Sequence, residues 1–306
     1  MAFDDFSDER RAVNGVSIHL RARRHPDAGA PALLLLHGFP QTHYIWRKVV
    51  ARLAQDYSLV CPDLRGYGDS DKPAGAPDHA NYSKRTMAQD MVGVMDALGY
   101  ERFAVVGHDR GARVAHRLAL DHAHRVLRLC LIDIAPTLTM YESTSMEFAR
   151  AYFHWFLLIQ PHPVPEMMLS GSAPQLLRMF LGRWGAGLAD YDEHALAEYQ
   201  RCWANPEGLH GSCEDYRASA GIDLQHDRES DARGDKLECP LQILWGKDGV
   251  IGRLFDPLAN WRAKSRGPLV GEALPAGHYI PEEVPELLLE HLVRFLADRS
   301  MRAGAG

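Results

Sequence analysis

One aspartate, Asp109, lies in a predicted turn between a strand and a helix, a position that can hold a nucleophile. Residues 103–106 are apolar and predict a short buried strand, residues 107–111 predict a sharp turn, and residues 112–122 predict a helix. Asp109 lies within that turn, at a strand-to-helix elbow where many enzymes of similar layout carry a serine. The sequence therefore predicts a carboxylate at the nucleophile position.

The change from serine to aspartate restricts the chemistry. A carboxylate that displaces a leaving group from saturated carbon forms an ester, which water can later cleave, whereas attack on a carbonyl gives only a reactive anhydride. A serine attacking the same saturated carbon would leave an ether, which is a dead end. With an ordinary pKa near ~3.9, Asp109 is ionised at neutral pH and needs no base for its attack. A base is needed only for the second, hydrolytic step.

A histidine near the end of the chain could be that base. His278 follows Gly277 after the last predicted strand, and the chain order nucleophile, acid, histidine is typical of α/β-hydrolases. Two acids could orient it, because Asp133 and Asp248 each end a predicted strand. We favour Asp133, since it ends an apolar strand where an unpaired carboxylate would be costly to bury. Asp248 could be a turn residue before Gly249, and it remains the second choice.

Two arginines beside the nucleophile indicate an acidic substrate. Arg110 directly follows Asp109, and Arg113 lies nearly one helical turn further on, so both could reach the same anion. A guanidinium group matches a carboxylate well, and the start of a helix favours an anion. Pairing with a surface acid is an alternative for Arg113, but it explains one arginine better than two. Both charges would also keep Asp109 ionised.

Two loops accompany these residues. The loop at residues 37–40, with the sequence His-Gly-Phe-Pro, resembles one that supplies a backbone N–H to an oxyanion hole, with the Arg110 N–H as its expected partner. The Phe39 side chain could equally form a wall of the pocket. Residues 63–70 lack the Gly-Lys-Ser/Thr of phosphate-binding loops, so we expect a structural turn there.

The composition is that of an ordinary globular protein. A chain of 306 residues, 46% of them hydrophobic and 24% charged, can bury a large core in one domain or in one domain with an insertion. The net charge of −6 argues against a nucleic-acid partner. Five cysteines without metal-type spacing, and a start unlike a signal peptide, indicate a reducing compartment, so a cytoplasmic location is expected. No apolar stretch is long enough to cross a membrane.

Predicted strands and helices alternate over most of the chain, which places it in the α/β class with a mostly parallel central sheet flanked by helices. Between about residues 136 and 233 the pattern offers helices and no strand, which predicts an inserted helical cap. We therefore expect a core domain over residues 1–135 and 236–306 and a cap over 136–235. A hairpin is expected over 9–24, further strands over 31–36, 58–62, 103–106, 126–134, 241–245 and 270–274, and helices over 87–98, 112–122 and 285–296.

The predicted cap is rich in aromatic residues, most of which we expect simply to fill its core. Three of its side chains carry a polar donor on a ring, and such groups can solvate a departing anion without competing as nucleophiles: His154, Trp155 and Tyr216. From the residues alone, these three would also be core residues. We expect five further aromatic residues to lie in the core of the cap: Tyr141, Tyr152, Trp184, Tyr199 and Trp203.

Taken together, these motifs resemble the fluoroacetate (haloacetate) dehalogenases of the α/β-hydrolase superfamily over nearly the whole chain. An aspartate at the elbow is shared with haloalkane dehalogenases and epoxide hydrolases, which often carry Trp after the nucleophile. Arg110 with Arg113 singles out the haloacid branch. The matching segments are residues 37–40, 63–70, 107–113 and 277–278, together with Asp133, His154, Trp155 and Tyr216.

The resemblance implies an α/β-hydrolase fold with a helical cap, and a role for each residue. Asp109 would attack the α-carbon and expel halide while Arg110 and Arg113 bind the substrate carboxylate. His278, oriented by Asp133, would then activate the water that hydrolyses the ester. Fluoride is a poor and heavily hydrated leaving group, so donors in a dry pocket must replace its water. The resemblance assigns that task to His154, Trp155 and Tyr216.

The same resemblance implies a small haloacid as substrate, no metal, no organic cofactor and a homodimer. Two other functions remain open. An epoxide hydrolase would need two cap tyrosines to bind the epoxide oxygen, and Tyr141, Tyr152 or Tyr216 could supply them, although Arg110 argues against it. A haloalkane dehalogenase would use the same Asp-His-Asp residues. A ligand receptor built on an inactive hydrolase fold is disfavoured by the complete set of triad residue types.

Overall fold

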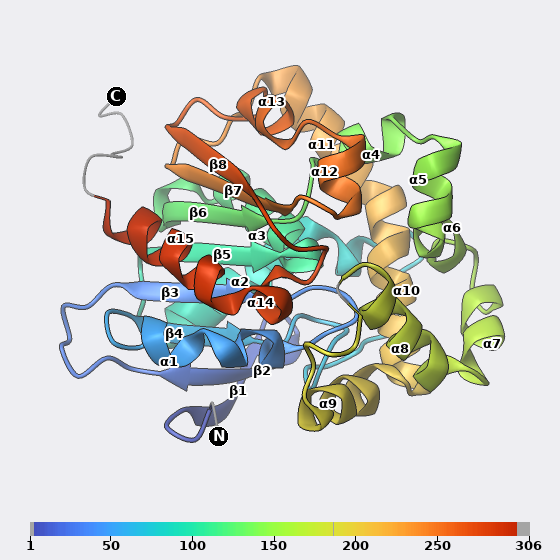
Figure 1. Cartoon of the computed structure of the whole chain (residues 1–306), viewed down its shortest axis with the longest axis horizontal. Helices are drawn as coiled ribbons and strands as arrows, with labels where there is room; N and C mark the ends of the chain where they lie inside the picture. Colours follow the sequence, from blue (N-terminus) through green and yellow to red (C-terminus); the bar gives the residue numbers. More distant parts are fainter. Residues whose placement is uncertain (1–2, 186, 299–306) are drawn as a thin grey trace.

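The structure, a computed structural model, describes residues 3–185 and 187–298, and it centres on one eight-stranded sheet (Figure 1). The strand order is β1-β2-β4-β3-β5-β6-β7-β8, with β1 antiparallel to β2, β2 antiparallel to β4 and all other neighbours parallel. The strands are β1 (Ser7–Val13), β2 (Val16–Arg23), β3 (Ala32–Leu36), β4 (Ser58–Pro62), β5 (Phe103–His108), β6 (Val126–Ile132), β7 (Leu241–Gly246) and β8 (Leu269–Leu274). The predicted α/β class and mostly parallel sheet are confirmed.

The central strands are apolar because both of their faces are covered. Every residue of β3, β4 and β5 is buried. Leu34 and Leu36 belong to one hydrophobic core, whereas Leu33 and Leu35 belong to the other. Alternate residues of a strand point to opposite faces, so each strand contributes to both cores.

Helices cover the two faces of the sheet. The core that contains Leu34 also contains residues of α2 (Lys84–Ala97) and α3 (Asp109–Asp121). The other core contains residues of the 3₁₀ helix η1 (His43–Lys48), α1 (Val50–Leu53) and α15 (Pro285–Ala297). Figure 1 shows α1 and α15 in front of the sheet and α3 behind it. The remaining elements outside the 136–235 region are η2 (Ala80–Tyr82), η3 (Ala123–Arg125), α12 (Val250–Leu254), α13 (Pro257–Arg262) and α14 (Ile280–Glu283).

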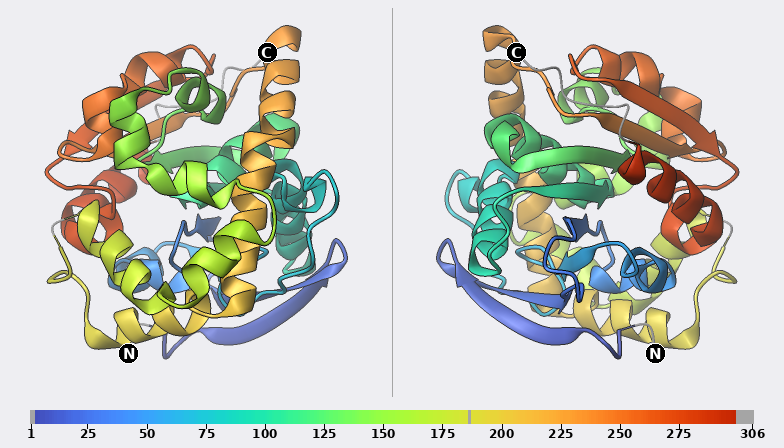
Figure 2. Two further views of the ribbon diagram at one scale, coloured as in Figure 1. Left: turned by 90° about the vertical axis from the view of Figure 1, so that its right-hand side faces the viewer. Right: turned by 90° about the vertical axis from the view of Figure 1, so that its left-hand side faces the viewer.

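Between β6 and β7 the described residues form helices and no strand, apart from an isolated bridge between Leu237 and Ser265. We refer to residues 136–235, apart from residue 186, as the insert segment. Its helices gather beside the sheet, on the right in Figure 1, and α10 and α11 run past the others as a long rod in Figure 2. They are α4 (Thr137–Glu142), α5 (Met146–Ala151), α6 (Phe153–Leu158), α7 (Val164–Ser170), α8 (Ala173–Arg183), α9 (Glu193–Trp203), α10 (Pro206–Ala220) and α11 (Ile222–Arg233).

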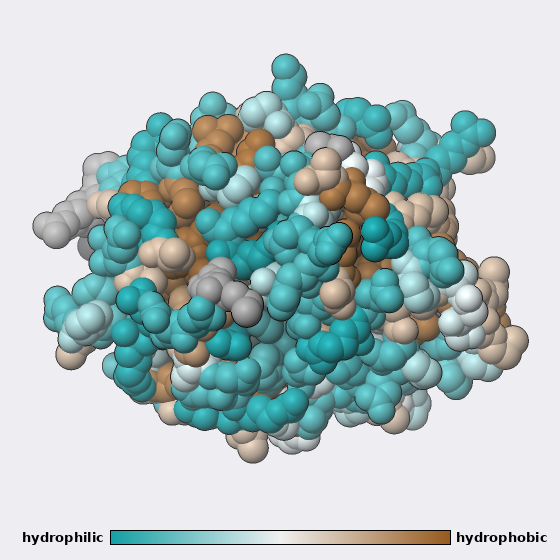
Figure 3. Space-filling view, turned by 60° about the horizontal axis from the view of Figure 1, so that its bottom comes forward, coloured by the Kyte–Doolittle hydropathy of each residue, from teal (hydrophilic) through white to brown (hydrophobic). Residues whose placement is uncertain are grey.

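The surface is mainly polar on the face drawn in Figure 3, where hydrophobic residues form small separate groups. Within residues 3–185 and 187–298, no helix has both the length and the apolar character that crossing a membrane requires.

Candidate functional site

The elbow between β5 and α3 is tighter than the sequence suggested. Helix α3 begins at Asp109 itself, three residues before its predicted start, and Asp109 has a φ of 45°. A positive φ is uncommon for a residue other than glycine. A Cβ atom on Gly38 would lie 2.5 Å from the Asp109 Cβ, and one on Gly111 would lie 2.3 Å from the His37 carbonyl oxygen. The neighbouring glycines therefore allow the loop after β3 to approach the aspartate closely.

The Asp109 carboxylate is almost completely buried and accepts a hydrogen bond. The backbone N–H of Phe39 donates to its Oδ2 at 3.1 Å. Burial opposes ionisation, but the nearby charges of His278, Arg110 and Arg113 outweigh it and hold the pKa of Asp109 below its usual value. Asp109 is therefore a buried, ionised carboxylate at neutral pH.

His278 contacts Asp133, the acid favoured from the sequence. The His278 Nδ1 lies 2.5 Å from the Asp133 Oδ2, and the Gly246 N–H donates to Oδ1 at 2.9 Å. Burial lowers the pKa of His278, but the Asp133 carboxylate more than compensates, so the net shift is upward. Asp133 follows the end of β6 with a φ of 52°, rather than lying within the strand as predicted. Asp248 lies in the turn after β7, where its N–H donates to the Ala276 carbonyl.

Arg110 is fully buried but already bound on two of its three nitrogens. Its Nε donates to Asp215 Oδ2 at 2.7 Å, and its Nη2 donates to Asp215 Oδ1 at 2.9 Å and to Ser219 Oγ at 2.5 Å. The Cζ atom lies 4.1 Å from the centre of the Tyr216 ring. The third nitrogen, Nη1, is buried and has no hydrogen-bond partner within the described parts of the chain.

Arg113 is buried as well, so the alternative of a surface ion pair is wrong. Its Nη1 donates to Thr137 Oγ1 at 2.8 Å and to the Ala135 carbonyl at 3.2 Å, while its Nη2 lies 3.1 Å from the Met140 sulfur. Its Nε is buried without a partner among residues 3–185 and 187–298. Burial and the charge of Arg110 lower the pKa of Arg113. Each arginine thus keeps one buried donor nitrogen without a partner in the described structure.

Three ring side chains of the insert segment pack together beside Phe39. The Phe39 ring stacks on His154 with centroids 5.6 Å apart, the His154 and Tyr216 rings are 5.6 Å apart, and Trp155 and Tyr216 are 6.2 Å apart. Phe39 therefore offers both its N–H and its ring to this region. Burial lowers the pKa of His154 far below its usual value, and its Nδ1 has no partner in the described structure. A neutral imidazole still carries one N–H donor.

Sequence reasoning missed three residues at this site. Trp184 was expected only to fill the core, and Tyr152 was considered beyond the core only as an epoxide donor. Each ring lies 6.3 Å from the His278 ring, and the Trp184 carbonyl accepts the backbone N–H of His278 at 2.6 Å. Asp215 was not singled out at all. The one available signal was its position next to Tyr216, since a contact with Arg110 across 105 residues leaves no local pattern.

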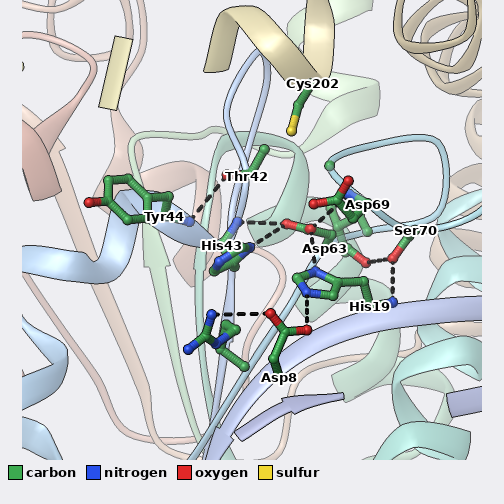
Figure 4. Close-up of polar contacts among 12 residues, drawn as sticks. Asp8, His19, Thr42, His43, Tyr44, Asp63, Asp69, Ser70 and Cys202 are labelled. Atoms are coloured by element: carbon green, nitrogen blue, oxygen red, sulfur yellow. Dashed lines mark hydrogen bonds and ion pairs between the residues drawn. The ribbon is translucent and has the colours of Figure 1, made fainter. Parts of the chain in front are cut away.

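Residues 63–70 form a structural turn, as expected, and Figure 4 shows why it is fixed. Asp63 Oδ1 accepts hydrogen bonds from the His43 backbone N–H and the His43 ring at 2.8 and 2.9 Å. Its Oδ2 accepts from the His19 ring at 2.8 Å and from the Asp69 N–H at 3.0 Å. Despite its burial, these neighbours hold the pKa of Asp63 well below the usual value. The carboxylate is already well supplied with donors, which favours a structural role over metal binding.

Comparison with known proteins agrees with this geometry. Residues 31–285 match the family model described as alpha/beta hydrolase fold. The chain is 45% identical over 269 residues to a fluoroacetate dehalogenase of a Burkholderia species, covering 88% of each protein. It is 31% identical to a soluble epoxide hydrolase of Corynebacterium sp. (strain C12), covering 96% of this chain and 98% of that one.

A solved structure from Nostoc sp PCC 7120, provisionally described as an alpha/beta hydrolase, superposes with a TM-score of 0.93. Its sequence is 50% identical, and the match covers 96% of this chain and 99% of the other. A structure of the epoxide hydrolase CorEH without ligand has a TM-score of 0.86 at 29% identity, covering 95% and 99% of the two chains. The resemblance inferred from the motifs is thus confirmed, and the chain belongs to the alpha/beta hydrolase fold family.

Proposed function

We propose that this protein hydrolytically dehalogenates haloacetates, converting fluoroacetate to glycolate and fluoride through a covalent ester on Asp109. The observation that carries the proposal is the pair of buried N–H groups without partners, Arg110 Nη1 and Arg113 Nε, on two cations that both act on the charge of Asp109. A buried donor without an acceptor is costly, and a substrate carboxylate would satisfy both. The Burkholderia relative's name supports the same substrate class.

In the first step, Asp109 would displace the halide. The Phe39 N–H binds Oδ2, which leaves Oδ1 free to attack the α-carbon. A carbon–oxygen bond forms while the carbon–halogen bond breaks, and the halide leaves with the bonding electron pair. The ring donors of His154, Trp155 and Tyr216 would replace the water around the departing fluoride.

In the second step, water would cleave the ester. His278 removes a proton from water, which attacks the carbonyl carbon of the Asp109 ester, and Asp133 stabilises the resulting imidazolium. The Phe39 N–H would stabilise the negative charge that develops on the carbonyl oxygen. Collapse of this intermediate expels glycolate, whose oxygen takes the proton from His278. Asp109 then ionises again, now carrying one oxygen from water.

We further propose that the insert segment is the cap that closes this site, since His154, Trp155 and Tyr216 all come from it. Division into a core over residues 1–135 and 236–306 and a cap over 136–235 remains our interpretation. Residues 1–2 and 299–306 of that core and residue 186 of that cap lie outside the described part of the chain. The homodimer remains a prediction, as does the cytoplasmic location.

Epoxide hydrolysis is the second candidate. Epoxide hydrolases are among the relatives at 31% identity, and the rings of Tyr152 and Tyr216 lie near His278 and His154. However, the Arg110 guanidinium covers the Tyr216 ring at 4.1 Å and offers a charge that a neutral epoxide does not need. Incubation with styrene oxide, fluoroacetate and chloroacetate, followed by assay of diol and halide, separates the two activities.

The direct test is mass spectrometry of the His278→Ala protein after incubation with fluoroacetate. Without its base, the protein should complete the first step and stop, leaving a glycolyl ester on Asp109. The double variant Asp109→Asn, His278→Ala is the control and should remain unmodified. If the ester is absent from Asp109 with every haloacetate tried, the proposed reaction is wrong.

A further inference from the structure

A buried group of charged side chains lies behind Arg110, on the side away from its unpartnered Nη1. Asp215 is fully buried and binds Arg110 through both carboxylate oxygens. The Tyr67 hydroxyl donates to Asp215 Oδ2 at 2.6 Å, and the Lys84 ammonium donates to Oδ1. We propose that Asp215 and Lys84 are positioning residues that make Arg110 selective for a carboxylate substrate. This inference rests on the proposed function and deepens it.

Asp215 decides which N–H of Arg110 is free. A guanidinium group is a rigid, planar fork with five N–H donors. Asp215 takes the edge formed by Nε and Nη2, and its backbone carbonyl accepts from Nη2 at 3.0 Å. Ser219 binds the same Nη2. The fork can therefore neither rotate nor withdraw, and Nη1 remains in a fixed position.

Lys84 acts on the net charge behind Arg110 rather than on the position of its guanidinium group. Asp215 alone would neutralise Arg110 and weaken its attraction for an anionic substrate. A second buried carboxylate, Asp223, pairs with the Lys84 ammonium, its Oδ2 lying 3.7 Å from Nζ. Because Lys84 also contacts Asp215, its charge offsets one of the two carboxylates, and without it the group behind Arg110 would carry a net negative charge. Burial would raise the pKa of Asp215, but Arg110 and Lys84 lower it, so the carboxylate stays ionised.

The proposal predicts a loss that depends on the charge of the substrate. Asp215→Asn keeps the shape of the side chain but removes the charge and one acceptor that hold Arg110. Lys84→Met keeps the length of the side chain but removes the ammonium. Chloroacetate and chloroacetamide differ mainly in charge and carry the same leaving group. Both variants should therefore lose reactivity toward the anion and largely retain it toward the amide.

The experiment measures the rate at which Asp109 is alkylated in the His278→Ala background, followed by intact-protein mass spectrometry. With chloroacetate, Asp215→Asn and Lys84→Met should each slow alkylation by about tenfold or more, which is the fold-change for the loss of one charge-assisted contact. With chloroacetamide, the rate should stay within about twofold. The control is Asp227→Asn, which breaks the Arg117–Asp227 pair between α3 and α11 and should alter neither rate.

Equal slowing with both compounds would show a merely structural role and overturn the proposal, as would unchanged rates with both. Tyr67→Phe removes one hydrogen bond to Asp215 and replaces the charged variants if they do not fold. It should slow alkylation by chloroacetate alone, by about twofold to threefold.

If His278→Ala alone gains no adduct, the proposed function fails instead. Acetate affinity, measured by titration calorimetry, then still tests the positioning: binding as tight in Asp215→Asn as in the unaltered protein would overturn it.

Discussion

Asp109 and His278 have pKa values shifted in opposite directions, and this separates the two proposed steps by their pH dependence. Asp109 stays ionised below its usual titration range because its pKa is lowered. His278 must be neutral to accept a proton from water, and its raised pKa means that it becomes protonated at a higher pH than usual. Lowering the pH should therefore stop ester hydrolysis before it stops ester formation.

The ester should accordingly accumulate on the unaltered protein in mild acid. We expect the esterified fraction of Asp109 during steady turnover of chloroacetate to rise as the pH falls through the pKa of His278 and to be small above it. Acid quenching at a series of pH values, followed by mass spectrometry, measures this fraction. An esterified fraction that increases with pH would contradict the role given to His278.

The donor at His154 should matter more for fluoride than for chloride, because fluoride is the more strongly hydrated ion. Removal of one preorganised donor typically lowers kcat by about 10²–10³. We expect His154→Leu to lower kcat for fluoroacetate by about this factor and for chloroacetate by at least about tenfold less. Halide release from both substrates provides the comparison within one variant. Equal losses would indicate that His154 does not contact the leaving halide.

Residue type and spacing predicted those site residues that lie close together in the sequence or follow a recognisable strand. Asp109, Arg110 and Arg113 share one turn of helix, and His278 was recognisable by its place after a strand. Asp215 was not, because its partner Arg110 is 105 residues away and the contact depends on how α10 packs. Similarly, Trp184 looked like any core aromatic, and only tertiary packing puts its carbonyl on the His278 N–H.

Among the elements, the elbow and the loop after β3 control the position of the nucleophile. Gly38→Ala should strongly reduce dehalogenation, since its Cβ would fall 2.5 Å from the Asp109 Cβ and 2.8 Å from the His108 carbonyl oxygen. We expect a loss of about 10²-fold, the cost typical of a misplacement near 1 Å. Gly171→Ala, which meets no atom within 4 Å, is the control and should keep full activity.

If Gly38→Ala retains its activity while circular dichroism shows a native fold, close packing of this loop does not position Asp109.

Composition and length decided which elements could be predicted from the sequence. Strand β3 could be predicted because all its residues are apolar, and β4 because Ser58 is its one polar residue. Helices α12, α13 and α14 were missed, since four to six residues are too few to show a helical period.

On the scale of the whole molecule, Asp63 links segments that are far apart in the sequence. It joins His19 of β2 and His43 of η1 to the turn after β4. Breaking such a buried pair by removing one charge typically costs about 3–5 kcal/mol. We expect Asp63→Asn to lower the free energy of unfolding by about this amount. Asp56→Asn, which breaks the exposed pair with Arg52, should change it by less than about 1 kcal/mol.

The Asp63 contribution should also depend on pH. Because its pKa is lowered in the folded protein, its stabilising effect is complete above the unfolded value of ~3.9 and is lost as the pH falls through the folded value. The pKa of His19 is raised, despite burial, by Asp63, so its effect is complete below ~6.5 and lost as the pH rises through the folded value. Urea unfolding of the unaltered protein and of Asp63→Asn should therefore differ most between about pH 4 and 6.5. A difference that does not vary with pH would exclude this ionic role.

The candidate site draws its residues from segments that are far apart in the sequence. Asp109, Asp133 and His278 follow different strands of the sheet, whereas His154 and Tyr216 come from the insert segment. The loss of strand patterns after residue 135 predicted that this part of the chain would be helical, as it is in the described residues. The sequence could not predict that Arg110 would be bound mainly to the insert segment, because that contact forms only when the two parts pack together.

The most direct test of the proposed reaction is a single turnover in water enriched in heavy oxygen, with enzyme in excess over fluoroacetate. If Asp109 forms the ester, the first glycolate released must carry oxygen from the unlabelled side chain, and the label must appear in the peptide that contains Asp109. Glycolate labelled in that first turnover, with unlabelled Asp109, would mean that water attacks the substrate directly and would contradict the covalent mechanism.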